Sequence, residues 1–250
     1  MRFKPLVFVL AMLVSAGAQA SASKEENYSY PLSDGGSLSV SNVNGSITVT
    51  GGSGKTVEIK ATKKADREKS LEDIKIKISH TADSIDIETD LPHFNHWFSH
   101  DEGEVTYVIT VPAGTNLDSV ETVNGTVKVS AVKGEVTAES VNGNLDLSDL
   151  ADDVKMSTVN GRIRAVFAAC KGRQKVKAET VNGSVVLLLP KDTDAAISVD
   201  TLNGHIDAHD FDLDADKGFV GSDLDGKVGD GNASISVDTV NGSVKINRRQ

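Results

Sequence analysis

The chain has 250 residues, of which 38% are hydrophobic, 25% are charged and 4% are aromatic, and it contains a single Cys. Its apolar content is carried by Val, Ile, Leu and Ala, with 22 Gly and 5 Pro, so we expect a thin, β-branched core rather than an aromatic-lined ligand cavity. The formal net charge of −10 argues against nucleic acid as a partner, because phosphate neutralisation requires clustered Lys and Arg.

Residues 1–20 have the pattern of a secretory signal peptide. Arg2 and Lys4 precede an apolar stretch at residues 6–14, and small residues precede a cleavage point after Ala20 or after Ala22. The apolar stretch is too short for a membrane-spanning helix, which needs about 20 residues. Removal of the leader leaves 24 basic residues against 36 acidic ones, a net charge of −12. We therefore expect residues 21–250 to form one exported β-repeat domain.

The first part of this domain, residues 21–116, contains irregular strands. Apolar and polar residues alternate in period two in several segments, which indicates strands. Residues 63–71 are rich in charge and fit either a short helix or a solvated loop. The strands predicted from this alternation cover residues 38–50, 56–60, 74–78, 85–87 and 104–112.

Three histidines lie in the segment between the last two of these strands. His93, His96 and His100 are close enough in sequence to bind zinc or copper, but their spacing matches no established zinc signature. The same segment holds the only Trp of the chain. An aromatic-rich loop that caps a β-stack is therefore the favoured interpretation, and a metal site is the alternative.

An Asn-Gly motif recurs seven times along the chain. The residue before the Asn is Val in six copies and Leu202 in the seventh, the residue two before it is always Thr, Ser or Asn, and the residue two after the Gly is always aliphatic. The regular repeats occupy residues 117–248 at intervals near 20 residues, with residues 224–228 as a candidate degenerate copy. The motif copies lie at Asn44-Gly45, Asn124-Gly125, Asn142-Gly143, Asn160-Gly161, Asn182-Gly183, Asn203-Gly204 and Asn241-Gly242.

This repetition predicts an all-β, single-domain β-solenoid, similar to a parallel β-helix, in which each repeat contacts only its neighbours. Asn and Gly tolerate positive φ, so each pair is expected at a corner, with Thr and Asn side chains stacked as hydrogen-bonded ladders. On this view, a Val at Gly161 would destabilise the fold. An antiparallel β-meander, with Asn-Gly as type I′ hairpin turns, is the alternative.

Candidate chemical sites within the repeats have weak signatures. Asp212, Asp214 and Asp216 resemble a calcium loop, but the required Gly and the bidentate Glu are missing, so a strand with an acidic outer face is favoured. Acids at Asp152 and Asp153, or the pair Arg162 and Arg164, offer a face for polysaccharide cleavage without any specific spacing. Nucleophile, zinc-protease, phosphate-binding and dinucleotide motifs are missing from the sequence. We therefore predict no catalytic, cofactor-binding or metal-binding residue and no cofactor.

The lone Cys170 lies in an apolar segment and is expected to be a buried, inert thiol, with intermolecular pairing as the alternative.

Five acids occupy one column, three residues before the motif Asn, and should form an acidic stripe along one face. They are Glu121, Glu139, Glu179, Asp200 and Asp238.

The repeated unit, as in residues 237–246, resembles that of the bacterial family named putative adhesin, a domain of unknown function related to toast-rack and autotransporter-head-like β-repeat domains. The likeness covers residues 38–246 and includes the strand and proline turn at residues 108–114. It implies a cell-envelope β-solenoid with no assigned catalytic residues.

The chain continues for only four residues after Ile246, with no translocator segment and no lipid-attachment Cys. We therefore expect a periplasmic protein, with secretion as the alternative. The function predicted is a non-enzymatic, adhesin-like interaction or structural module that contacts an envelope protein or glycan. A protein that binds or cleaves polysaccharide is the alternative.

Overall fold

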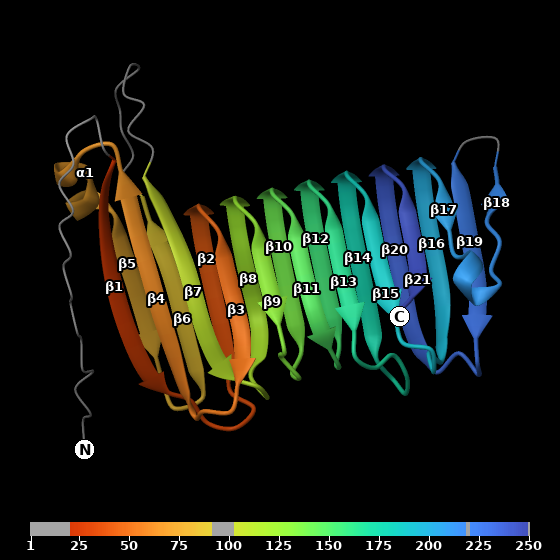
Figure 1. The fold of residues 1–250 in the computed structure, drawn as a ribbon, viewed down its shortest axis with the longest axis horizontal. Coiled ribbons are helices and arrows are strands. Elements are labelled where there is room, and N and C mark those ends of the chain that lie inside the picture. Colours follow the sequence, from red (N-terminus) through yellow and green to blue (C-terminus); the bar gives the residue numbers. More distant parts are fainter. Residues whose placement is uncertain (1–20, 92–102, 219–220, 250) are drawn as a thin grey trace.

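The computed structural model describes residues 21–91, 103–218 and 221–249. They form two sheets that face each other along an elongated stack (Figure 1). Two short helices accompany the strands, α1 (Glu68–Asp73) and the 3₁₀ helix η1 (His209–Phe211). Within this part of the chain, no helix has the length and apolar character needed to span a membrane. The signal-peptide prediction for residues 1–20 lies outside the described residues.

Sheet A has ten strands and forms one layer of the stack. In spatial order these are β1 (Ala22–Pro31), β4 (Thr56–Ala65), β7 (Glu104–Pro112), β3 (Ile47–Gly52), β9 (Val127–Ser130), β11 (Leu145–Leu150), β13 (Ile163–Phe167), β15 (Val185–Leu189), β21 (Val244–Arg248) and β17 (Ile206–Asp207).

Sheet B has eleven strands and forms the other layer. In spatial order these are β18 (Asp216–Lys217), β19 (Ser222–Val228), β16 (Ala195–Asn203), β20 (Ala233–Asn241), β14 (Lys175–Asn182), β12 (Val154–Asn160), β10 (Val136–Asn142), β8 (Asn116–Asn124), β2 (Ser37–Asn44), β6 (Ser84–Asp90) and β5 (Lys75–His80).

Each motif copy consists of a strand in sheet B, the Asn-Gly turn and a strand in sheet A. Neighbouring copies pair in parallel in both sheets, and the motif residues lie in register, as Asn142 does with Asn160 and Leu145 with Ile163. This parallel, in-register pairing is consistent with a β-solenoid-like repeat. The antiparallel meander considered as an alternative is wrong for these copies, because its hairpins would pair consecutive strands antiparallel.

The core lies between the two sheets and consists mainly of aliphatic side chains. Alternate residues of each strand point inward, as Val185, Leu187 and Leu189 do in β15, and these three are fully buried. Tyr107 and Phe167 are the two aromatic residues among the largest fully buried side chains described. The period-two alternation in the sequence thus predicts both the strands and the inward face.

The motif asparagines form one continuous side-chain ladder along the turns. Each Nδ2 donates a hydrogen bond to the Oδ1 of the preceding Asn in the stack, at 2.8–3.0 Å. At one end, Asn44 donates to the Gly103 carbonyl oxygen at 3.2 Å. This confirms the predicted amide ladder. Its spatial order is Asn44, Asn124, Asn142, Asn160, Asn182, Asn241 and Asn203.

Interrupting this ladder should lower stability in proportion to the hydrogen bonds lost. Asn160→Ala removes one donated and one accepted bond, and we expect a loss of about 1 kcal/mol in the free energy of unfolding. Asn203→Ala removes only its donated bond to Asn241 and should cost about half as much. Chemical denaturation of both variants measures the difference, and an equal loss at the two positions would contradict the ladder's contribution.

The motif glycines are required for a different reason from the one predicted. Of the seven, only Gly45 has φ in the left-handed region. At the other six, an added Cβ atom would collide with the backbone of the neighbouring copy. A Cβ atom on Gly161, for example, would lie 1.9 Å from the Gly143 carbonyl oxygen. At these six positions glycine is therefore selected because adjacent turns approach closely, and not because of positive φ.

The hydroxyl groups two residues before the motif Asn do not bond to one another. Instead, Thr158 donates to the Gly143 carbonyl oxygen at 3.0 Å, and Ser140 donates to that of Gly125 at 3.0 Å. These hydroxyls, like those of Thr122 and Thr201, thus tie their own copy to the turn of the neighbouring copy, whereas the Oγ1 atoms of Thr180 and Thr239 have no hydrogen-bond partner. The predicted Thr ladder is therefore corrected to side-chain to backbone bonds at four of the copies.

The copies do not stack in chain order at the end of the repeats. The last copy, β20 with β21, lies between β14 with β15 and β16 with β17, so the chain first passes over this position and later returns to fill it (Figure 1). Residues 224–228 are not a degenerate copy, because they belong to β19, which pairs antiparallel with β16. There Gly226 leaves room for Leu213, whose Cδ2 would be 2.6 Å from an added Cβ.

The first copy is also internal. β2 lies between β6 and β8, and β3 lies between β7 and β9. Antiparallel strands β1, β4 and β5 complete this end of the stack, and α1 covers it with Ser70 and Leu71 buried. The charged segment at residues 63–71 thus divides into the end of β4 and the start of α1. The strands predicted at residues 56–60, 74–78, 85–87 and 104–112 correspond to β4, β5, β6 and β7.

Candidate interaction face

The outer face of sheet B carries an exposed line of aliphatic side chains, which we call the aliphatic row. It is formed by the residue before each motif Asn, which points outward because the buried Thr, Ser or Asn precedes it in the strand. These side chains are 36–50% exposed. The seven motif copies are stacked about 4.8 Å apart, so the row is about 29 Å long. Its members in spatial order are Val43, Val123, Val141, Val159, Val181, Val240 and Leu202.

A line of mostly carboxylate side chains, the acidic row, runs beside the aliphatic row, two residues earlier in the strands of the repeats, and continues onto β19. The position is Ser41 in the first copy and Ser157 in the fourth. Members of the row are neighbours in register, since Glu179 lies opposite Asp238, and Asp238 opposite Asp200. This confirms the predicted acidic stripe. In spatial order the row contains Glu121, Glu139, Ser157, Glu179, Asp238, Asp200 and Asp223.

Charge compensation is unequal along the acidic row. Lys155 lies 2.9 Å from Glu139, and Lys177 lies 2.8 Å from Glu179. Asp238, Asp200 and Asp223 have no cationic partner within ion-pair distance among the described side chains. Burial, followed by the charges of Asp238, Asp223 and Asp225, raises the pKa of Asp200 above its ordinary value. The end of the row near β16 therefore carries uncompensated negative charge.

Asp200→Asn should relieve this repulsion and raise the melting temperature by about 1–2 °C at pH 7 and low salt. Because folding raises the pKa of Asp200, the ionised group destabilises the folded state above that pKa, and the penalty disappears as the pH falls below it. The wild-type and variant melting temperatures should therefore converge near pH 3. About 1 M salt should narrow the difference without closing it, because salt screens the repulsion between the carboxylates and leaves the burial of Asp200 unchanged.

Asp146→Asn is the matched control for this prediction. Asp146 lies on the outer face of sheet A, opposite Lys128 and Arg164 in register, so removing its charge should give no gain. An increase for Asp200→Asn that persists unchanged in 1 M salt would contradict the electrostatic explanation.

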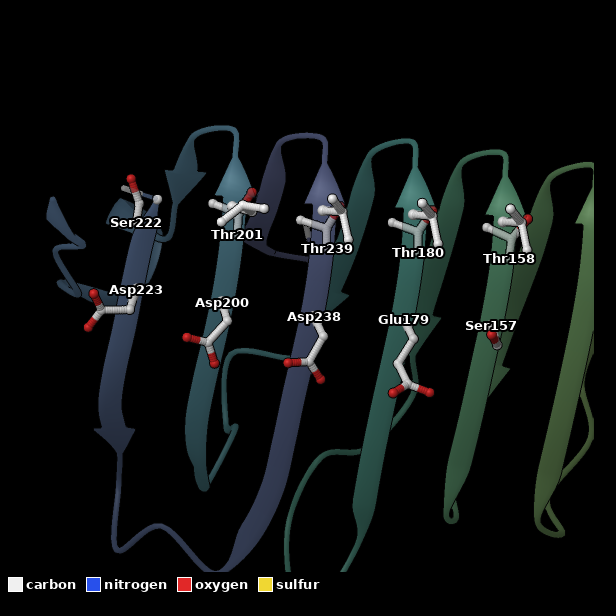
Figure 2. Close-up of a pocket in the computed structure, with 15 residues that line it drawn as sticks. Ser157, Thr158, Glu179, Thr180, Asp200, Thr201, Ser222, Asp223, Asp238 and Thr239 are labelled. Atoms are coloured by element: carbon white, nitrogen blue, oxygen red, sulfur yellow. The ribbon is translucent and has the colours of Figure 1, made fainter. Parts of the chain in front are cut away.

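The two rows line a shallow groove of about 430 Å³ over strands β12, β14, β20, β16 and β19. Figure 2 shows the carboxylates of Glu179, Asp238, Asp200 and Asp223 in one line across the strands. Val181, Val240 and Leu202 line the same groove. The groove runs across the strands, parallel to the long axis of the stack.

The residues proposed from sequence for metal binding do not form a site within the described residues. His93, His96 and His100 lie outside those residues. The segment around Asp212, Asp214 and Asp216 is not a continuous strand, because η1 comes first, Asp212 adopts a left-handed conformation and β18 is only two residues long. In the described ranges, no three His, Cys, Asp or Glu side chains are grouped closely enough to hold a metal ion.

The two alternative pairs considered for polysaccharide cleavage lie at opposite ends of β12 and do not combine into one site. Asp152 and Asp153 precede β12, whereas Arg162 follows the Asn-Gly turn at its other end. A strand of seven residues separates them, which corresponds to about 23 Å. The Asp153 carboxylate accepts a hydrogen bond from the Lys175 backbone N–H at 2.7 Å, which is a structural contact between neighbouring copies.

Cys170 is buried and unpaired, as predicted. Burial, followed by the charge of Asp194, raises the pKa of its thiol to about 11. The thiol is therefore protonated at neutral pH, and its reactivity is low.

Comparison with known proteins identifies similar solved structures. No family model matches the chain, and no curated protein matches it. A putative cell adhesion protein from Clostridium sporogenes ATCC 15579 has 15% identity and a TM-score of 0.47, with 90% of this chain and 100% of that chain covered. A putative adhesin from Bacteroides fragilis NCTC 9343 has 11% identity and a TM-score of 0.43, with 89% and 97% covered. The chain is thus similar, over about 90% of its length, to structures described as bacterial adhesins or cell adhesion proteins.

Proposed function

We propose that this chain is an exported, non-enzymatic interaction module of the bacterial cell envelope. It acts as a β-solenoid that presents the outer face of sheet B to an envelope protein or glycan. The observation that supports this proposal is the repetition of the same outward side chains along one face, an aliphatic residue in all seven copies and a carboxylate in five of them. Catalysis requires different groups that converge within hydrogen-bond reach, whereas repeated rows suit an extended contact.

Binding to isolated envelopes tests this function. Mature protein should remain bound after washing, and substitutions along the aliphatic row should weaken it in steps, because the contact is spread over several coils. We expect less than a threefold loss for Val181→Ser alone and more than a tenfold loss when Val141→Ser and Val240→Ser are added. In the control, Val166, Val186 and Leu188 are changed to Ser. These three side chains are half-buried on the outer face of sheet A, so the change should leave binding within twofold.

Two results would contradict the proposal. One is the absence of retention on envelopes. The other is turnover of an envelope glycan that stops on substitution of one or two acids, which would instead support the polysaccharide-cleaving alternative.

Export is tested separately, by fractionating cells that express the full chain. The proposal expects a shortened protein in the periplasmic fraction, whose N-terminal residue is Ser21 or Ser23. Full-length protein retained in the cytoplasm would contradict it.

A further inference from the structure

The groove on the outer face of sheet B combines two kinds of surface in a fixed arrangement. Val181, Val240 and Leu202 are 39–50% exposed and form one side. The carboxylates of Asp238 and Asp200 lie on the other, two residues away in the same strands (Figure 2). Two residues of a strand span about 7 Å. An apolar line and an anionic line therefore run in parallel at about that separation.

The chemistry of the two lines defines what would cover them. Exposed aliphatic side chains gain free energy when apolar groups of a partner remove them from water. Uncompensated carboxylates favour a partner that carries Lys or Arg. A partner with only one of these features would leave half of the groove unmatched, so the occupant must be both apolar and cationic.

The spacing of the coils selects the conformation of the occupant. The groove crosses five strands, so its four intervals of about 4.8 Å cover about 19 Å. Four turns of an α-helix cover about 22 Å. A helix with one apolar side chain per turn therefore places one such side chain near each strand of the groove. In an extended segment, side chains on one face repeat every 6.8 Å or so, and four such intervals reach about 27 Å. The side-chain spacing of a helix thus nearly matches the spacing of the strands, whereas the side chains of an extended segment no longer align with the strands after two of them.

We propose that this groove binds a cationic amphipathic helix of about four turns, lying along the stack axis with its apolar stripe on the aliphatic row and Lys or Arg over the acidic row. This inference rests on the proposed function and specifies the partner chemistry of the same face. The binding site centres on Asp238, Asp200 and Asp223, because Lys155 and Lys177 already pair with Glu139 and Glu179.

The probe for this proposal is a synthetic 18-residue peptide of Leu and Lys, with Leu at helical spacing along one face. Fluorescence anisotropy with purified mature protein should show saturable binding that weakens as salt increases. Circular dichroism should show added helix in the complex. Asp200→Asn with Asp238→Asn should weaken binding at least tenfold in low salt, and Val181→Ser with Val240→Ser should do the same in any salt.

The matched control is Asp146→Asn with Asp207→Asn, which makes the same change of net charge on strands of sheet A and should leave affinity within twofold. Melting curves establish that each variant is folded before binding is measured. The proposal is overturned if a scrambled peptide of the same composition binds equally well, or if a peptide with Glu in place of Lys does so. Equal binding by wild-type protein and both groove variants would also overturn it.

The envelope assay separates failure of this inference from failure of the proposed function. If mature protein binds envelopes but not the Leu and Lys peptide, the helix proposal is wrong and the interaction function stands. If the peptide binds in the groove but envelopes retain no protein, the proposed function is wrong and the helix proposal stands.

Discussion

Gly161→Val should destabilise the protein by about 4 kcal/mol or more, which places it among the most damaging single substitutions. A Cβ atom at Gly161 would lie 1.9 Å from the Gly143 carbonyl oxygen and 2.6 Å from its carbonyl carbon. Relief by local movement is limited, because the same contact recurs on the next copy, where Gly183 faces the Gly161 carbonyl oxygen. Denaturant unfolding measures the loss, and the variant is expected to expose its core at temperatures where the wild type is folded.

Two controls isolate the close approach of the turns as the cause. Arg162→Ala changes the next residue, whose side chain is exposed, and should alter stability by less than about 0.5 kcal/mol. Gly114→Ala adds a methyl group in open space, with no heavy atom within 4 Å, whereas Gly161→Ala should retain most of the damage caused by Val. Similar stabilities for the two Gly→Ala variants would refute the steric explanation.

Lys63→Ala should destabilise the protein by about 2–3 kcal/mol, because it removes two hydrogen bonds from a buried charged group, while Glu26 keeps its contacts with Tyr28 and Lys24. Lys63 is 6% exposed in total, and its Nζ donates to Glu26 Oε1 at 3.1 Å and to the Ile74 carbonyl oxygen at 3.0 Å. The control is Lys60→Ala in the same strand. Lys60 pairs with Glu25 at 2.6 Å, but both side chains are well exposed, so its loss should cost less than about 1 kcal/mol.

This effect should depend on pH. Burial alone would raise the pKa of Glu26, but hydrogen bonds from Tyr28, Lys63 and Lys24 outweigh it, and the pKa lies below its ordinary value. A carboxyl whose pKa is lowered by folding contributes stability above its unfolded pKa of about 4.3, and this contribution is lost as the pH falls through the folded pKa. The gap between wild type and Lys63→Ala should therefore narrow below about pH 4, and a constant gap from pH 7 to pH 3 would contradict the role of the ion pair.

The sequence predicts the stacking of repeats better than it predicts their order. Columns of like residues require parallel pairing in register, and the Asn ladder follows from the same columns. Because the copies are so alike, however, each offers the same edges to every other copy. No local signal therefore indicates that Asn241 lies between Asn182 and Asn203. The long spacing between the last two motifs instead predicts a further copy at residues 224–228. In the structure these residues belong to β19, which pairs antiparallel with β16 at the end of sheet B.

The candidate face could be predicted only in part. The five acids of the repeats are recognisable in the sequence because they share one position of the motif. Asp223 is not recognisable in this way, since it belongs to an antiparallel strand outside the repeat. The aliphatic row also has a signal in the sequence. The residue before the motif Asn is always aliphatic, yet it directly follows the inward-facing Thr, as Val181 follows Thr180, and period two therefore directs it outward.

The internal position of the last copy determines how the molecule bears mechanical load. β21 is flanked by β15 and β17, and β20 by β14 and β16. A pull on residue 248 can peel residues 246–248 from β15, their only strand partner, but it must then shear hydrogen bonds on both edges at Val244 and Lys245 and along β20. A terminal strand could be peeled from one edge throughout. β1, at the opposite end, pairs with β4 alone and otherwise contacts α1. Under tension between the two ends, extension should begin at β1 and α1, and the coils that carry the aliphatic and acidic rows should stay intact longest.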